Sequence, residues 1–232
     1  TAEKVGHLFG ITRAQSDAYA AESHQRLAKA QKEGFLKGEV ETAFSRDGKF
    51  YDHDDGVRPD STSDTLAKLK PVFERPWGQV TAGNSSPLTD GASATLICSE
   101  AFVNRHGLKP LARIAGYAVA GCAPEIMGIG PVEATRKALS RAGIRNTDLD
   151  VIEMNEAFAS QVLACCRDLD IDPKSLNRDG GAIALGHPLG MSGARLVLTA
   201  VHGMEKRGGK LALPTMCVGV GQGVAVAIEK LN

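Results

Sequence analysis

The sequence lacks several features that would assign a chain to a class at once. It has no apolar run approaching the ~20 residues that a membrane-spanning helix needs, and it contains no internal repeat. Lysine plus arginine and aspartate plus glutamate each number 27, so no net charge favours nucleic acid or a membrane surface. We therefore expect neither as a partner, and any anionic ligand would be held by local groups.

Metal-binding and disulfide patterns are also missing. The five cysteines are Cys98, Cys122, Cys165, Cys166 and Cys217. None belongs to a C-x-x-C pair, no H-E-x-x-H motif occurs, and the odd count argues against a disulfide framework in a chain of this length. The acidic stretch 52–55 is typical of a solvated loop. We therefore expect no metal site and a reducing compartment.

The chain opens at Thr1 rather than at methionine, and a helix is expected almost at once. We therefore expect an internal portion of a longer protein. Neither a secretory leader nor a peroxisomal tripeptide is visible. The expected location is cytoplasmic, with the mitochondrial matrix open for a eukaryotic source.

The first part of the chain predicts helices separated by polar loops. Thr12 and Gln15 fit a capping box, and residues 16–32 predict an exposed helix with His24 at the surface. Shorter helices are expected over 61–69 and 93–106.

Strands and helices alternate from residue 111 on. The pattern predicts strands over 111–119, 149–154, 210–216 and 224–228 and helices over 132–142 and 192–206. A further helix is expected to begin within 155–159 and to continue to about residue 169. This order indicates one half of an α/β layered domain. Pro214 cannot donate to a ladder, so its strand is expected at an edge or at a bulge. Cys165 and Cys166 are expected to be packing residues.

Residues 180–195 carry the strongest chemical signal. They hold five glycines and His187, directly before an apolar helix. Glycines let a backbone approach a ligand closely, and a helix N-terminus offers free N–H groups. A histidine fixed there can act as base, acid or oxyanion donor. The loop alone leaves open that His187 is purely structural.

Two further candidate sites follow strands. Asn155 and Glu156 come directly after a buried strand, at the edge where open α/β sheets bind ligands. Cys217 precedes Gly219 in a hairpin with a glycine tip, where freed N–H groups can lower the pKa of a thiol or hold an oxyanion. A strand rather than a helix follows this tip, which disfavours a nucleotide-binding loop and a nucleotide-dependent oxidoreductase.

Together these motifs resemble those of the thiolases, which make and break carbon–carbon bonds in acyl-CoA thioesters. The resemblance runs from Thr1 to Leu231. It rests on the glycine–histidine segment 180–195 and on four shorter strings: Thr81-Ala82-Gly83-Asn84, Asp90-Gly91-Ala92, Asn155-Glu156-Ala157-Phe158-Ala159 and Cys217-Val218-Gly219.

The resemblance implies a thiolase-like layered αβα fold. Residues 1–86 would form most of the loop domain that covers CoA, residues 87–110 a remnant of the N-terminal thiolase half, and residues 111–232 the C-terminal domain. The implied activity is thiolytic cleavage of 3-ketoacyl-CoA by CoA, as in the β-oxidation of fatty acids, or the reverse Claisen condensation of acetyl-CoA. Coenzyme A would be a substrate, and no cofactor is expected.

The resemblance also implies the roles of individual residues. His187 would activate the nucleophilic cysteine and, with a water held by Asn155, form the first oxyanion hole. Cys217 would be the acid/base at the α-carbon, and the N–H of Gly219 would contribute to the second oxyanion hole. The residues implied to contact CoA or the acyl chain are Arg58, Thr65, Leu69, Ala82, Ser86, Met127 and Phe158.

Two departures from the family pattern bear on function. Apart from Cys217, no cysteine lies in a matching motif, so the nucleophile is expected in an N-terminal half that this chain lacks. The chain alone would then be inactive and expose an apolar face. A non-catalytic CoA-binding or assembly fragment is the alternative function, and a homodimer or tetramer is expected.

The second departure is at Val220. Thiolases usually have glycine at this position, and a β-branched side chain would restrict the loop if φ were positive there.

Overall fold

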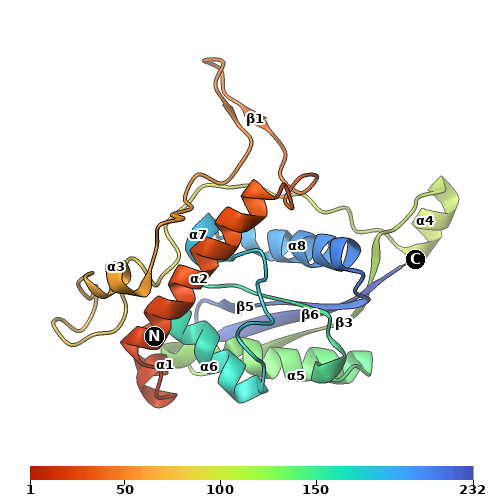
Figure 1. Cartoon of the computed structure of the whole chain (residues 1–232). Helices are drawn as coiled ribbons and strands as arrows, with labels where there is room; N and C mark the ends of the chain where they lie inside the picture. The colour runs from red at the N-terminus through yellow and green to blue at the C-terminus, as the bar shows by residue number, and fades with distance from the viewer. Residues whose placement is uncertain (232) are drawn as a thin grey trace.

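A four-stranded mixed sheet organises the C-terminal part of the chain. The computed structural model describes residues 1–231 (Figure 1). The sheet has the order β3–β6–β5–β4. Its strands are β3 (Ala112–Gly121), β4 (Val151–Met154), β5 (Leu211–Val218) and β6 (Gln222–Lys230). β4 runs parallel to β5, whereas β5 and β6 form the predicted antiparallel hairpin.

Helices cover both faces of this sheet. α8 (Ser192–Arg207) packs on β4 and β5 from one side. α5 (Gly130–Ala142) packs on β3 and β6 from the other side, next to α6 (Ala159–Leu169) (Figure 1). The interior between them consists of small and aliphatic side chains such as Ala138, Val162 and Leu213. The predicted α/β layered architecture is therefore confirmed.

The N-terminal helices pack directly on this layered part. α1 (Ala2–Leu8) lies against α6. α2 (Arg13–Lys32) contacts α6 and two short helices, α3 (Ser63–Ala67) and α7 (Ala182–Leu185). The capping box of Thr12 and Gln15 is formed as predicted.

The predicted exposure of α2 is wrong. Tyr19, Ser23 and Leu27 are buried, and so is His24, whose Nδ1 accepts a hydrogen bond from the Arg58 N–H at 3.2 Å. Polar side chains of this helix can enter the interior because partners on the opposing segments satisfy their hydrogen bonds. Composition alone shows the polarity of these residues but not those partners.

Two further predictions need correction. The helix expected from residue 93 begins only at α4 (Glu100–His106), where the Ser99 hydroxyl accepts a hydrogen bond from the Phe102 N–H. The residues before it are extended, and Leu96 is 81% exposed. The strand with Pro214 is neither an edge nor bulged, because β5 lies between β6 and β4 and keeps one register with each. The pairs on both sides of Pro214 hold the strand despite the missing donor.

The remaining elements are short. β1 (Ala43–Phe44) and β2 (Phe50–Tyr51) form a hairpin that projects from the body (Figure 1). Two 3₁₀ helices span Pro124–Ile129 and Asn146–Asp148. Large apolar side chains are exposed before and on β3, including Leu88, Ile97 and Tyr117. Within residues 1–231, no helix has the length and apolarity that a bilayer crossing requires.

Candidate active site

β4 delivers Asn155 to the carboxyl edge of the sheet. The Asn155 N–H donates to the Thr215 carbonyl at 2.9 Å, so the pairing with β5 continues just past the end of β4. The Asn155 side chain is buried, and its Nδ2 lies 3.2 Å from Nε2 of His187. Because Cys217 follows Thr215 on β5 by two positions, adjacent strands bring Asn155 and Cys217 to the same edge.

His187 is held from both sides of its ring. Its Nδ1 lies 2.6 Å from Oγ of Ser192, and the Ser192 hydroxyl donates to the Pro188 carbonyl at 2.9 Å. That hydroxyl has a single proton, so it must accept from Nδ1–H, which leaves Nε2 to accept from Asn155. Burial, and secondly the charge of Arg195, lower the pKa of His187. The imidazole is therefore neutral at pH 7 with a lone pair on Nε2, as a general base requires.

Glu156 supports the glycine–histidine loop rather than the chemistry. Its carboxylate is buried and accepts hydrogen bonds from the side chains of Tyr19, Ser23 and Asn177 and from the N–H of Ile183. A Cβ on Gly181 would lie 2.3 Å from the Glu156 carboxyl carbon, so this position requires glycine. The sequence shows that Glu156 follows Asn155, but it does not show that the Glu156 carboxylate contacts Gly181 and Ile183 at the start of the glycine–histidine loop.

A second close approach shapes the loop next to His187. Gly186 has φ of +101°, and a Cβ there would lie 2.3 Å from Oγ1 of Thr89. The hydroxyl of Ser93 donates to the Met191 carbonyl at 3.0 Å, so residues near 90 cover the loop. The sequence reasoning missed both Ser192 and this cover. A hydroxyl at the start of the helix after His187 was the available signal for Ser192.

Cys217 lies near the end of β5 and is only 6% exposed. Burial raises the pKa of its thiol to about 11. The suggestion that neighbouring N–H groups lower this pKa is therefore wrong, since burial outweighs them. The hairpin tip that follows, Gly219 and Val220, is exposed, and Val220 has φ of +71°. Because φ is positive at this position, the β-branched side chain of Val220 restricts the loop.

The segment before α6 joins several residues implied to contact CoA. The Ser86 N–H donates to the Ala157 carbonyl at 3.0 Å, and Ser85 pairs with Phe158. A Cβ on Gly83, next to Ala82, would lie 2.5 Å from Leu69. Leu69, Ala82, Ser86 and Phe158 therefore lie along one continuous path from α3 to the start of α6.

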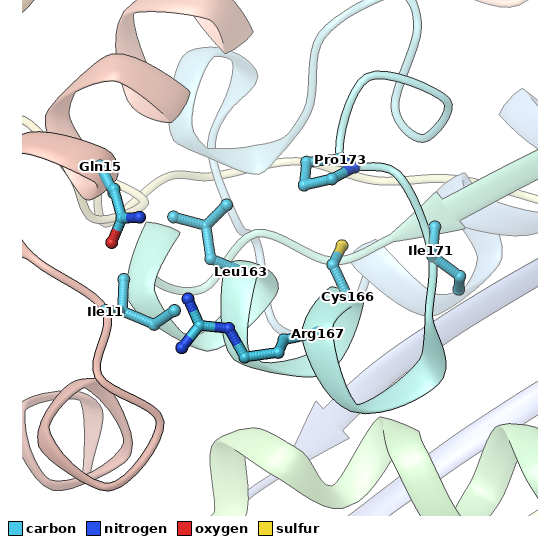
Figure 2. A pocket seen from close by; sticks show the side chains of 7 residues that line it. All are labelled: Ile11, Gln15, Leu163, Cys166, Arg167, Ile171 and Pro173. Carbon is cyan, nitrogen blue, oxygen red and sulfur yellow. The ribbon is translucent and has the colours of Figure 1, made fainter.

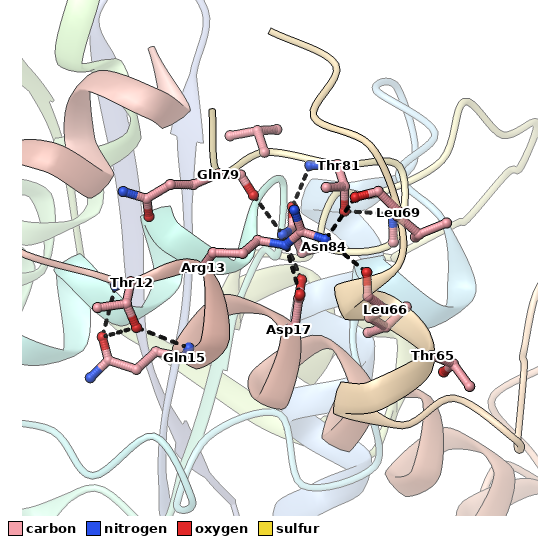
Figure 3. Close-up of polar contacts among 12 residues, drawn as sticks. Thr12, Arg13, Gln15, Asp17, Thr65, Leu66, Leu69, Gln79, Thr81 and Asn84 are labelled. Carbon is pink, nitrogen blue, oxygen red and sulfur yellow. Dashed lines mark hydrogen bonds and ion pairs between the residues drawn. The ribbon is translucent and has the colours of Figure 1, made fainter. Parts of the chain in front are cut away.

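A polar cluster beneath this path holds it in shape (Figure 3). Arg13 pairs with Asp17 at 2.6 Å, and its Nη2 donates to the Leu66 and Leu69 carbonyls. Nδ2 of Asn84 donates to Asp17 at 2.9 Å. α2 thus anchors both α3 and the turn of residues 81–84.

The other implied CoA contacts lie at the two ends of this region. Arg58 and Thr65 are exposed, the first shortly before α3 and the second within it. Met127 is half-buried in the 3₁₀ helix Pro124–Ile129, which packs on β5 and β6.

Two other features do not coincide with the candidate active site. A hollow of about 280 Å³ (Figure 2) is lined by Ile11, Gln15, Leu163, Cys166, Arg167, Ile171 and Pro173, and it contains none of the predicted site residues. Glu3, His7 and Glu74 place potential metal ligands within 4.8 Å of one another. However, Glu3 already accepts from the N–H groups of Gln79 and Val80.

Comparison with known proteins assigns this arrangement to one family. The family models described as thiolase, N-terminal domain and thiolase, C-terminal domain match residues 1–101 and 108–230. Over 236 aligned positions the chain is 53% identical to the beta-ketoadipyl-CoA thiolase of Pseudomonas aeruginosa, covering 100% of this chain and 59% of that relative. It is 51% identical to the 3-ketoacyl-CoA thiolase of Vibrio vulnificus, covering 99% and 61%. The chain thus spans about three-fifths of the length of these relatives.

The solved structures agree. The chain superposes on human mitochondrial 3-ketoacyl-CoA thiolase with a TM-score of 0.96 and 46% identity, covering 100% of this chain and 59% of that one. The complex of the same human enzyme with CoA gives 0.96 as well, covering 99% and 58%. The predicted thiolase-like fold is confirmed, and the chain belongs to the thiolase family.

Proposed function

We propose that this chain forms the His187, Asn155 and Cys217 side of a thiolase active site, which cleaves 3-ketoacyl-CoA with CoA or condenses acetyl-CoA in reverse. One observation carries the proposal: a neutral His187 is held between Asn155 and Ser192 at the sheet edge where β5 presents Cys217. The names of the relatives, 3-ketoacyl-CoA thiolase and beta-ketoadipyl-CoA thiolase, support it.

The chemistry follows from the protonation states of the two groups. Nε2 of His187 takes the proton of a nucleophilic cysteine, which the resemblance expects in the remaining part of a longer polypeptide. The thiolate adds to C3 of the substrate, and the bond between C2 and C3 breaks. The acetyl-CoA enolate then takes the thiol proton of Cys217, which is present at neutral pH because the pKa is raised to about 11.

The second half-reaction restores both groups. The Cys217 thiolate takes the proton of the incoming CoA thiol, and the CoA thiolate displaces the nucleophilic cysteine from its thioester. His187 returns its proton to that cysteine. His187, together with a water held by Asn155, is the proposed donor to the first oxyanion, and the N–H of Gly219 contributes to the second.

The proposed CoA contacts are Arg58, Thr65, Leu69, Ala82, Ser86, Met127 and Phe158. CoA is a substrate in this scheme, and the residues supply the reaction without a further cofactor. A human thiolase of the same fold solved with CoA supports this placement. The biological setting that we propose is β-oxidation in the cytoplasm by a homodimer or tetramer.

Turnover of acetoacetyl-CoA with CoA tests the proposal, together with the intact mass of the purified material. Thiolysis that falls on the order of 10²-fold or more in His187→Ala would support the enzyme, because that change removes both a base and an oxyanion donor. The alternative function is a non-catalytic CoA-binding or assembly fragment of a thiolase. CoA binding without turnover by the purified material, at the intact mass of this chain alone, would support that alternative.

A further inference from the structure

A buried ion pair lies directly beside the His187 site and is not used by the chemistry above. Arg195 on α8 and Glu153 on β4 are both buried, with 3.5 Å between Nη1 and Oε2. Nε of Arg195 and Oε2 of Glu153 make no hydrogen bond within residues 1–231. Burying a charged pair is costly, and a pair with such incomplete hydrogen bonding recovers little of that cost. The pair therefore needs an explanation other than stability.

The pair and the His187 contacts connect the same two elements. Glu153 and Asn155 are two residues apart on a strand and point to the same side. Arg195 and Ser192 are three residues apart on a helix and share a face. Asn155–His187–Ser192 and Glu153–Arg195 are thus two neighbouring links between β4 and α8, about 6.6 Å apart along the strand and about 4.5 Å along the helix.

We propose that Arg195, paired with Glu153, is the positioning residue of His187: the pair sets the distance between β4 and α8 on which the Asn155–His187–Ser192 contacts depend. The charge of Arg195 has a second effect. It contributes to lowering the pKa of His187, after burial, and keeps the imidazole neutral. This inference rests on the proposed function, in which the imidazole of His187 acts as the base.

Other charges also face Arg195. Glu39 and Asp54, from the segment that covers α8, feel its charge, and His202 lies 3.6 Å from Glu39. Burial raises the pKa of Glu153 to about 8 although the charge of Arg195 opposes this rise, so the carboxyl group already exchanges its proton near neutral pH. Without Arg195, the carboxyl group of Glu153 is held in its protonated form still more strongly and does not remain as an unpaired buried charge.

The test is the titration of the His187 ring by NMR in the full-length protein, with the resonance assigned through His187→Gln. Arg195→Met should raise the pKa of His187, and Arg195→Lys should keep it near the wild-type value because the charge remains. Arg207→Met is the matched control, because Arg207 pairs with Asp179 at 2.5 Å in the last turn of the same helix. It should leave the titration unchanged.

If Arg195→Met does not fold, the double variant Glu153→Leu/Arg195→Met removes both partners of the pair without leaving an unpaired buried charge. The pKa of His187 is then measured in that variant. An unchanged His187 titration in whichever variant folds would overturn the proposal. In the full-length protein, Arg195→Met should lower kcat on the order of 10²-fold, the loss that a displacement of about 1 Å produces, with little change in KM. The titration does not depend on turnover, so a failure of the proposed function would remain distinguishable.

Discussion

The loop that presents His187 and the hairpin tip that follows Cys217 are both rich in glycine, for different reasons. In the loop, two glycines are required by contact: added Cβ atoms would lie 2.3 Å from Glu156 at Gly181 and 2.3 Å from Thr89 at Gly186. At the tip, a Cβ on Gly219 would meet nothing within 4 Å, and Val220 is 84% exposed. Packing therefore fixes the histidine. At the hairpin tip, close packing begins only at Gly221, where an added Cβ would lie 2.3 Å from the Cys122 carbonyl oxygen, so Gly219 and Val220 are held by strand pairing and turn geometry.

This difference predicts where the molecule tolerates change. In the His187 loop, the free energy of unfolding should fall when a side chain is added at a packed glycine. The backbone conformation of the loop should matter less, because glycine already adopts it without strain. Gly219 and Val220 at the hairpin tip should tolerate added side-chain volume and respond to backbone preference. Four substitutions or conditions test the comparison, beginning with the largest expected effect.

The largest effect is expected at the base of the hairpin, where Cys217, the proposed acid/base, is buried. In the full-length protein, Cys217→Ala should lower condensation of acetyl-CoA on the order of 10³-fold or more, since no acid/base then exchanges the α-proton. Cys98→Ala is the control and should retain activity, because Cys98 lies in the extended segment before α4. Condensation within about twofold of wild type by Cys217→Ala would remove this residue from the mechanism.

The His187 loop should respond most to added volume at Gly181. Gly181→Ala should lower the free energy of unfolding by about 3 kcal/mol, because the new methyl group overlaps the Glu156 carboxyl group and its hydrogen bonds. Chemical denaturation measures this. Gly190→Ala, where a Cβ would meet nothing within 4 Å, should change stability by less than about 0.5 kcal/mol. Equal effects of the two substitutions would show that the loop is not fixed by contact.

Alkaline pH should reveal the burial of Cys217. Its folded pKa of about 11 lies above the ordinary value of 9.0. The unfolded chain therefore loses this proton first as pH rises. The resulting stabilisation is fully present below pH 9 and is lost as pH rises towards 11, by about 2 to 3 kcal/mol for this group. Buried Cys166 and Tyr19 titrate in the same direction, so the contribution of Cys217 is the difference between wild-type and Cys217→Ala denaturation curves from pH 8 to pH 11.

The smallest effect is expected at the exposed tip. Val220→Gly should raise the free energy of unfolding by about 1 kcal/mol, because a β-branched residue at φ of +71° is strained and glycine relieves more than its own entropy costs. Thermal unfolding measures this shift, and Val220→Ala, which keeps a Cβ, should recover less. If Val220→Gly unfolds more easily than the wild type, the valine side chain makes stabilising contacts despite its exposure.

Prediction from the sequence worked where a local rule is strong. The alternation of strands and helices from residue 111 predicted the layered part, and the capping box predicted the start of α2. It failed where long-range partners decide. Polar residues of α2 are buried because Glu156 and the 81–84 turn bind them. Residues before α4 remain extended although a helix was expected.

The sequence by itself determined the chemical groups of the site and the elements that carry them: an asparagine after a buried strand, a histidine in a glycine loop, and a cysteine before a glycine tip. Only the tertiary structure decided how those groups behave. The hydroxyl of Ser192 selects the tautomer of His187, burial keeps the thiol of Cys217 protonated, and Glu156 supports the loop. The physical reason is that protonation and orientation depend on desolvation and on partners distant in sequence, which local patterns do not encode.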